Sequence, residues 1–170
     1  MGAPDSRFSR LLRHLSTSSA KGRHAYPQPA LAEIATAIAA GEASHRGELR
    51  LIVEAALPFE LVWAGVTNRQ RALSLFAEYG VWDTEDNCGV LIYVNLAERA
   101  VDIVADRAIG RKIDAATWQA MCATMTAGFA NGEFRASTLA AIEHANALLR
   151  EHFPATGDRL NELPDSPLVL

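Results

Sequence analysis

Apolar and polar residues alternate strictly along residues 47–55 (GELRLIVEA), a pattern that predicts a β-strand. One face of this strand carries apolar side chains and suits a protein core. The other face carries the charged residues Glu48, Arg50 and Glu54. This charged face has two readings: an open sheet edge that faces water, or the wall of a polar cleft.

Residues 89–96 (GVLIYVNL) are almost continuously apolar, which is typical of a central strand covered on both faces. The short connection 97–99 leads directly into residues 100–106, and so short a loop predicts an antiparallel hairpin. Residues 58–66 (PFELVWAGV) are ambiguous between a short strand and an apolar loop.

Helical spacing of apolar residues predicts several helices around these strands. Thr67 and Gln70 form a capping box at the start of one of them. The predicted helices cover residues 29–41, 68–79, 115–131 and 136–153. The helix between the first two long strands is a crossover that makes them parallel, so the chain is expected to be an α/β fold with helices on both faces of a mixed sheet of about four strands.

The chain is expected to contain one folded domain, residues 28–154, between a basic N-terminal extension, residues 1–27, and an extended tail, residues 155–170. Within the extension, residues 6–15 form a short basic helix whose apolar residues share one face: Phe8, Leu11, Leu12 and Leu15. This spacing suits docking on the domain or on a membrane surface.

The overall charge excludes one class of partner. The net charge is −4, whereas a nucleic-acid-binding protein needs a basic face, so no nucleic acid is expected. Residues 1–24 hold five basic residues against Asp5, a net +4 that leaves −8 for the rest. No apolar run is long enough for a membrane helix or a secretory signal, and this favours a cytoplasmic location; the Arg- and Ser-rich start also resembles a transit peptide.

The densest group of chemically active residues is the turn Asp83-Thr84-Glu85-Asp86-Asn87 (the acidic turn), which directly precedes the apolar strand. Carboxylates this close repel one another unless a cation neutralises them, and hard oxygen ligands favour Ca²⁺ or Mg²⁺. Asp83, Glu85 and Asn87 stand at alternate positions, as in a ligand loop, although the spacing is not that of an EF-hand. Asp, Thr and Asn also serve routinely as turn and cap residues, and the two readings are compatible.

Other chemistry is weakly represented. Asp106 and Arg107 follow the hairpin, where they could simply pair. His45 precedes the charged strand and could donate a proton, although a surface position is the simpler reading. The chain has no GxGxxG, Walker, HExxH or GxSxG motif, so the usual nucleotide, zinc and hydrolase signatures are missing.

Four segments in this order resemble the TPM-domain family, in particular its soluble bacterial members: residues 45–57, 81–93, 101–110 and 152–167. The family takes its name from a thylakoid lumen phosphatase, a photosystem II protein and an animal receptor-associated protein. The resemblance implies a Rossmann-like three-layer α/β/α sandwich. It also implies a cation, often calcium, at an acidic site in some members, phosphatase activity in some plant members, and non-catalytic partnership with membrane complexes in others.

Residue by residue, the charged and polar positions of the family fall on Glu48, Arg50, Glu54, Asp83, Thr84, Glu85, Asn87, Asp106 and Arg107. The resemblance thereby proposes Asp83, Glu85, Asn87 and Asp106 as metal ligands. Two positions depart from the family pattern. Cys88 replaces an expected asparagine and removes an oxygen ligand, and Ala108 replaces an expected glycine and restricts the backbone.

Two functions follow from these observations. The first is a cation-binding module that acts with a protein partner or at a membrane surface. The second is a weak metal-dependent phosphatase, in which a metal-bound water attacks a phosphomonoester held by Arg50 or Arg107. The binding module is favoured, because no residue of the chain stands out as a nucleophile.

Overall fold

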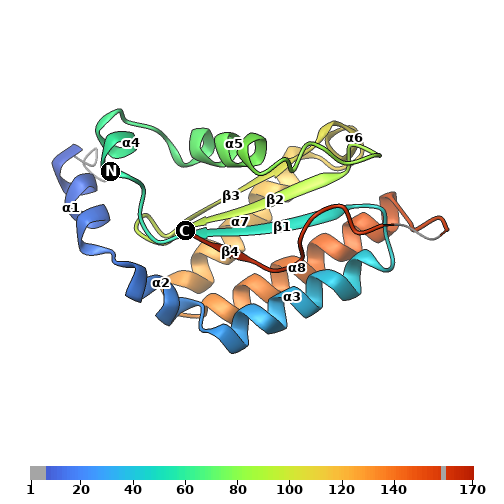
Figure 1. The fold of residues 1–170 in the computed structure, drawn as a ribbon, viewed down its shortest axis with the longest axis horizontal. Helices are drawn as coiled ribbons and strands as arrows, with labels where there is room; N and C mark the ends of the chain where they lie inside the picture. Colours follow the sequence, from blue (N-terminus) through green and yellow to red (C-terminus); the bar gives the residue numbers. More distant parts are fainter. Residues whose placement is uncertain (1–6, 158–159) are drawn as a thin grey trace.

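The computed structural model describes residues 7–157 and 160–170 (Figure 1). The helices are α1 (Arg7–Ser16), α2 (Ser19–Ala25), α3 (Gln28–Glu42), α4 (Phe59–Trp63), α5 (Asn68–Glu78), α6 (Arg107–Gly110), α7 (Ala115–Ala130) and α8 (Phe134–His152). The strands are β1 (Glu48–Glu54), β2 (Gly89–Asn95), β3 (Ala100–Ala105) and β4 (Leu168–Val169).

The strands form one mixed sheet in the order β3-β2-β1-β4. β1 pairs parallel with β2, from Glu48 opposite Gly89 to Glu54 opposite Asn95, and β2 pairs antiparallel with β3. The predicted crossover and hairpin are therefore confirmed. The fourth strand is β4, which pairs parallel with β1 at Ile52 and Val53.

Residues 58–66 contain no strand, so the readings of this segment as a strand or a loop are both wrong. Phe59–Trp63 form the short helix α4 instead. Phe59 and Trp63 lie one helical turn apart on α4, and their rings stack with centroids 6.0 Å apart. A short apolar run carries no periodicity that separates a strand from a helical turn.

Helices cover both faces of the sheet (Figure 1). On one face, α3, α7 and α8 enclose the larger part of the core, which includes Leu49, Leu51 and Val53 of β1. On the other face, α5 packs on β2 and β3 around Ile52. The three-layer α/β/α arrangement is thus confirmed, and so is the alternation along β1.

The charged face of β1 is not an open edge. All seven residues of the strand are buried, including Glu48, Arg50 and Glu54, which are 5%, 9% and 2% exposed. The pattern assigned the two faces correctly, but it could not show that α5 and the C-terminal segment cover the polar one.

The predicted basic helix exists as α1, which packs against α4. Its orientation was not predicted. His14 is the buried residue, whereas Phe8, Leu12 and Leu15 are exposed at 69%, 51% and 67%. The helix therefore contacts the domain through polar groups and turns most of its apolar stripe outwards. The rest of the N-terminal extension contains a second helix, α2, which was not predicted. No helix in the part of the chain described here is long and apolar enough to cross a membrane.

Helix ends follow local chemistry. The predicted capping box is present, because the Thr67 hydroxyl accepts from the Gln70 amide and the Gln70 side chain accepts from the Thr67 amide.

Gly41 does not end α3, which continues to Glu42. A Cβ at Gly41 would overlap the side chain of Asn146, so this glycine serves the close approach of α3 and α8.

Candidate functional site at the acidic turn

The acidic turn connects α5 to β2. Gly80 has a φ of 63° and ends the helix. The turn then folds on itself, because the Thr84 hydroxyl accepts from the Cys88 amide at 2.9 Å and the Asn87 amide donates to the Thr84 carbonyl at 3.1 Å. Asn87 has a φ of 54°, a conformation that asparagine tolerates better than most residues. The turn chemistry expected of Thr84 and Asn87 is therefore present.

Main-chain hydrogen bonds join this turn to the start of α6. The Asp106 amide donates to the Gly89 carbonyl at 2.9 Å, and the Ala108 amide donates to the Asn87 carbonyl at 3.2 Å. A Cβ at Gly89 would lie 1.8 Å from the Val81 carbonyl oxygen, so only glycine allows this close approach. The two segments that the sequence suggested as neighbours do meet at one end of the sheet.

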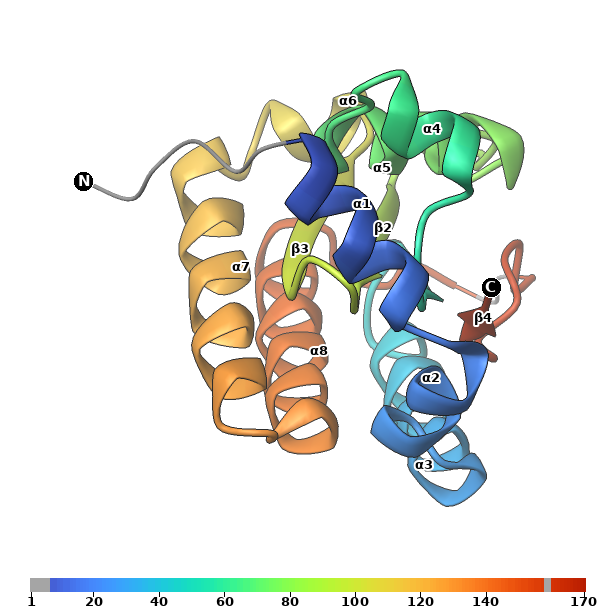
Figure 2. The same ribbon diagram turned by 90° about the vertical axis from the view of Figure 1, so that its left-hand side faces the viewer.

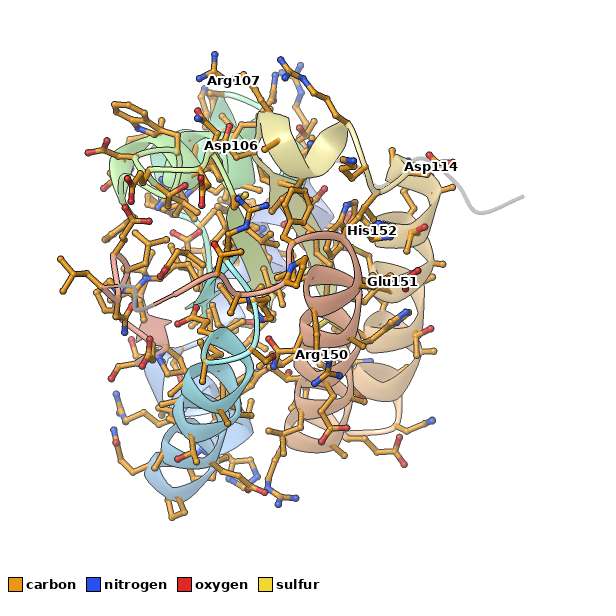
Figure 3. The ribbon with its side chains drawn as sticks, turned by 90° about the vertical axis from the view of Figure 1, so that its right-hand side faces the viewer. Asp106, Arg107, Asp114, Arg150, Glu151 and His152 are labelled. Carbon is orange, nitrogen blue, oxygen red and sulfur yellow. The ribbon has the colours of Figure 1, made fainter. Side chains whose placement is uncertain are left out.

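Asp106 is a buried carboxylate at this end, at 7% exposure. Its Oδ1 accepts from the Arg107 amide at 2.6 Å and caps α6, a helix that was not predicted. Its Oδ2 is buried and has no hydrogen-bond partner in the part of the chain that the structure describes. Arg107 is 79% exposed and donates from Nη2 to Asn87 Oδ1 at 2.7 Å, while its Nε lies 3.9 Å from Asp106 Oδ1. Figure 3 shows Asp106 and Arg107 together at this end of the molecule.

The remaining acids of the turn face outwards. Asp83 and Glu85 are exposed, and the Glu85 amide donates to Oε1 of Glu162 in the C-terminal segment at 2.9 Å. Asp86 Oδ2 lies 3.5 Å from Arg46 Nη1. The like charges of the turn are thus partly balanced by arginines.

A hollow of about 320 Å³ opens beside the turn. It is lined by Asp86, Asn87, Arg107, Ala108 and Arg111. Among residues 7–157 and 160–170, no three His, Cys, Asp or Glu side chains are grouped closely enough to hold a metal ion. A cation here would therefore need amide or main-chain oxygens, or a rearrangement of the exposed carboxylates, in addition to Asp106.

Glu54 lies at the other end of β1, away from the acidic turn. Arg71 of α5 binds its carboxylate with two hydrogen bonds, of 3.1 and 2.8 Å, and the Tyr93 hydroxyl donates to it at 2.7 Å. The hydrogen bond to Glu54 raises the pKa of Arg71, and burial followed by the nearby carboxylate raises the pKa of Tyr93. Glu54 is therefore a buried anchor between β1, β2 and α5.

Glu48 and Arg50 fasten the C-terminal segment to the sheet. Arg50 Nη1 donates to the carbonyls of Pro164 and Ser166, each at 2.6 Å, and Glu48 Oε2 accepts from the Leu163 amide at 3.2 Å. Burial lowers the pKa of Arg50. Glu48 lies at the same end of the sheet as the acidic turn, because it stands opposite Gly89 and its amide donates to the Cys88 carbonyl at 3.1 Å, but its carboxylate binds the C-terminal segment.

Comparison with known proteins identifies the chain. The sequence profile of the TPM domain matches residues 28–148, which is most of the chain. The protein belongs to the TPM-domain family. The fold of this TPM domain is similar to the NMR structure of BA42 protein from the psychrophilic bacterium Bizionia argentinensis, with a TM-score of 0.72 and 25% identity over 83% of this chain and 92% of that one. No curated protein matches the sequence.

The two departures from the family pattern have visible consequences in this TPM domain. The Cys88 side chain is buried, and its thiol donates to the Asp86 carbonyl at 3.3 Å, so it supplies no oxygen to the turn. Ala108 lies within α6, where a side chain is compatible with the helical backbone.

Sequence reasoning missed a second group of acids in the TPM domain. Glu42, at the end of α3, accepts from the Leu49 amide at 2.7 Å and lies near Glu48 and Asp165. Burial, together with these two carboxylates, raises the pKa of Glu42 to about 9, against the opposing hydrogen bond from Leu49. No spacing signal could reveal this group, because Glu42 and Glu48 belong to different elements and Asp165 lies more than 100 residues further along the chain.

His45 is not a surface residue, contrary to the simpler reading. It is 2% exposed, with Nδ1 at 3.1 Å from the Gly47 carbonyl and Nε2 at 3.0 Å from Asn146 Oδ1. Burial lowers its pKa. Both ring nitrogens are engaged in holding the start of β1 against α8, so His45 has a structural role.

Proposed function

We propose that this TPM domain binds a divalent cation, Ca²⁺ or Mg²⁺, at the acidic turn, with Asp106 as the central ligand. One observation carries the proposal: Asp106 Oδ2 is buried without a hydrogen-bond partner among the described residues. A buried carboxylate oxygen without a donor is costly, and a bound cation would compensate it. In this proposal Asp83, Glu85 and Asn87 complete the ligand set, and the lack of an oxygen at Cys88 weakens the affinity.

A matched pair of variants tests the cation site. Asp106 and Asp114 each cap a helix through Oδ1, but Asp114 begins α7, apart from the acidic turn (Figure 3). We expect Asp106→Asn to weaken Ca²⁺ binding by about tenfold or more, as loss of a charged ligand does, while Asp114→Asn binds like the wild type. Calorimetric titration with CaCl₂ and MgCl₂ measures both. Equal affinities for wild type and Asp106→Asn would show that Asp106 is not a ligand and would contradict the proposed cation site.

A second candidate activity is weak phosphomonoester hydrolysis. The observation that favours it is Arg107, whose exposed guanidinium lines the hollow next to Arg111 and beside the proposed cation ligands. In this scheme Asp106 would help to hold the cation, which would supply an activated water, and Arg107 would bind the phosphate oxygens; water would replace the alcohol, which leaves as its P–O ester bond breaks. The same two aspartate variants test it, because hydrolysis of p-nitrophenyl phosphate should disappear with Asp106→Asn and persist with Asp114→Asn.

We further propose that the module works against a membrane surface or a protein partner through α1. The support is the outward apolar stripe of Phe8, Leu12 and Leu15, together with Phe59 and Trp63 of the contacting helix α4, which are 51% and 68% exposed. These are five of the nine large apolar side chains that are exposed in the part of the chain described here. Apolar surface of this kind, flanked by basic residues, marks interaction sites.

Vesicle sedimentation tests the membrane form of this proposal. We expect wild-type protein to sediment with vesicles that contain phosphatidylserine, and the triple variant Phe8→Ser, Leu12→Ser, Leu15→Ser to remain in the supernatant. Leu73→Ser, at an exposed apolar position of α5, is the control and should behave as the wild type. If the wild-type protein does not sediment with the vesicles, a membrane surface is excluded and a protein partner remains. Such a partner would be sought by comparing the proteins that bind to wild type and to the triple variant.

A further inference from the structure

A larger pocket lies at the opposite end of the sheet from the acidic turn. It has a volume of about 610 Å³ and is formed by α1, α2, the turn between β2 and β3, and the start of α8. The acidic turn precedes β2, whereas this pocket includes Leu96 and Ala97, which directly follow it. Figure 2 shows α1 and α2 passing close to the turn between β2 and β3. In α/β folds, the carboxyl ends of parallel strands are the usual place for a small-molecule ligand.

Basic side chains line this pocket from two directions. Arg13 comes from α1, Lys21 and His24 come from α2, and Arg99 comes from the turn between β2 and β3. The Lys21 ammonium donates to the Ser16 carbonyl at 2.8 Å, which holds it at the pocket and leaves its other two N–H groups for a ligand.

Glu98, the acid among the described lining residues, is already neutralised. Its Oε1 accepts from Arg10 Nε at 2.6 Å and from His14 Nε2 at 2.9 Å. The Leu57 amide donates to His14 Nδ1 at 3.0 Å, so Nε2 is the nitrogen that faces Glu98. Although burial alone would raise it, these two donors lower the pKa of Glu98. Arg10 cancels the charge of Glu98, so Glu98 does not offset the charges of Lys21 and Arg99 in the pocket.

Arg99 has a φ of 49°, in the left-handed region that favours glycine or asparagine. A hairpin turn can supply this conformation more cheaply with either of those residues, yet this chain places a long cationic side chain there. The hairpin turn accounts for this backbone, because the Arg99 amide donates to the Leu96 carbonyl at 3.2 Å, so the informative feature is the cationic side chain at this position.

We propose that this pocket binds a small organic phosphate. Lys21, Arg99 and Arg13 supply charge-assisted donors for the phosphate oxygens, which accept several such bonds at once. Leu96, Ala97 and Phe134 supply apolar surface for the organic part of the ligand. The site shares no residue with the proposed cation site, so either proposal can fail without the other.

The test compares neighbouring cations of one helix. Lys21 and Arg23 are both exposed on α2, but only Lys21 lines the pocket. In calorimetric titration with inorganic pyrophosphate at low salt, we expect Lys21→Gln and Arg99→Asn each to weaken binding by about tenfold, the effect of one charged hydrogen bond. Arg23→Gln should bind within about twofold of the wild type, since it loses only a distant screened charge. No binding by wild type, or equal weakening in all three variants, would overturn the proposal.

Asparagine at position 99 keeps the turn conformation, so a loss of binding there does not reflect a broken hairpin. The apolar part of the proposal has its own comparison. Phenyl phosphate should bind more tightly than inorganic phosphate, because its ring can contact the apolar side chains. Equal affinities would show that Leu96, Ala97 and Phe134 do not contact the ligand.

A phosphate group can come from a free metabolite or from a lipid headgroup, and vesicles containing phosphatidic acid distinguish the two. The triple variant of α1 is used here, because it removes the apolar stripe but keeps the pocket residues. Sedimentation of this variant with the vesicles, reversed by pyrophosphate, would assign the pocket to a headgroup. Binding of pyrophosphate without sedimentation would assign it to a free phosphate compound.

Discussion

Replacing Arg71 with alanine is expected to lower the free energy of unfolding by about 3–5 kcal/mol, because it leaves the buried Glu54 carboxylate without its cation. The side chains of Arg71 and Glu54 are 14% and 3% exposed, so water cannot replace the lost hydrogen bonds. Tyr93 would remain as a donor to Glu54 at 2.7 Å, but a neutral hydroxyl does not compensate a full charge. Urea unfolding followed by circular dichroism measures the change.

The matched control is Arg135→Ala. Arg135 also binds a carboxylate through two hydrogen bonds, to Glu33, but both side chains are about half exposed. We expect its loss to cost much less than the loss of Arg71, because an exposed ion pair is screened by water and contributes little to stability. The double variant Glu54→Leu, Arg71→Met should recover part of the stability lost in Arg71→Ala, since no charge then remains buried. Equal effects of Arg71→Ala and Arg135→Ala would contradict the assignment of Glu54 as a buried anchor.

Replacing Glu42 with glutamine is expected to stabilise the protein increasingly as the pH rises. The folded-state pKa of Glu42 is raised from an ordinary value near 4.5 to about 9. The folded protein therefore holds a proton that the unfolded chain releases between these values, and wild type loses stability across this range by up to about 1.4 kcal/mol per pH unit. Glutamine stays neutral and can still accept from the Leu49 amide, so the variant avoids this loss.

The measurement is the difference in free energy of unfolding between Glu42→Gln and wild type, at about pH 5.5 and about pH 8.5. Taking the difference removes the contribution of His45, which is common to both proteins, and of other groups that titrate alike. Glu33→Gln, on the same helix but exposed, is the control and should show no growth of the difference with pH. A difference for Glu42→Gln that stays constant or shrinks with rising pH would show that Glu42 is ionised in the folded protein.

The sequence predicted the sheet well, because its signals are local. The alternation of β1, the apolar run of β2 and the short connection to β3 each depend on neighbouring residues, and all three were confirmed. The short elements were not predicted, because a local pattern needs several residues before it can be recognised. α4 and α6 have five and four residues, and β4 has two, so none is long enough to show a period.

Charged residues were harder to place than apolar ones. Alternation assigned Glu48, Arg50 and Glu54 to one face, but their partners lie far away in the sequence, at Leu163, Pro164 and Arg71. Nothing local indicates such pairs, so burial of these charges could not be predicted. The orientation of α1 has a similar cause, because Arg10 and His14 both bind Glu98, a residue 84 or more positions away.

The candidate site was predicted in part. Asn87, Asp106 and Arg107 come together at one end of the sheet, as their positions beside β2 and β3 indicated. The roles of Asp83 and Glu85 stay predictions, because their side chains are exposed at this end. Glu54 lies at the far end of β1 from Asp106, whereas Glu48 lies beside the turn and binds the C-terminal segment; the sequence alone does not show these contacts.

The C-terminal segment also protects the protein from other copies of itself. β4 pairs with only Ile52 and Val53, and Arg50 holds the preceding residues through two carbonyls. Behind this segment lies the outer edge of β1, a strand whose residues are buried on both faces. Unpaired edges of such strands add strands from neighbouring molecules and start aggregation. The single guanidinium of Arg50 thus contributes to colloidal stability as well as to the fold.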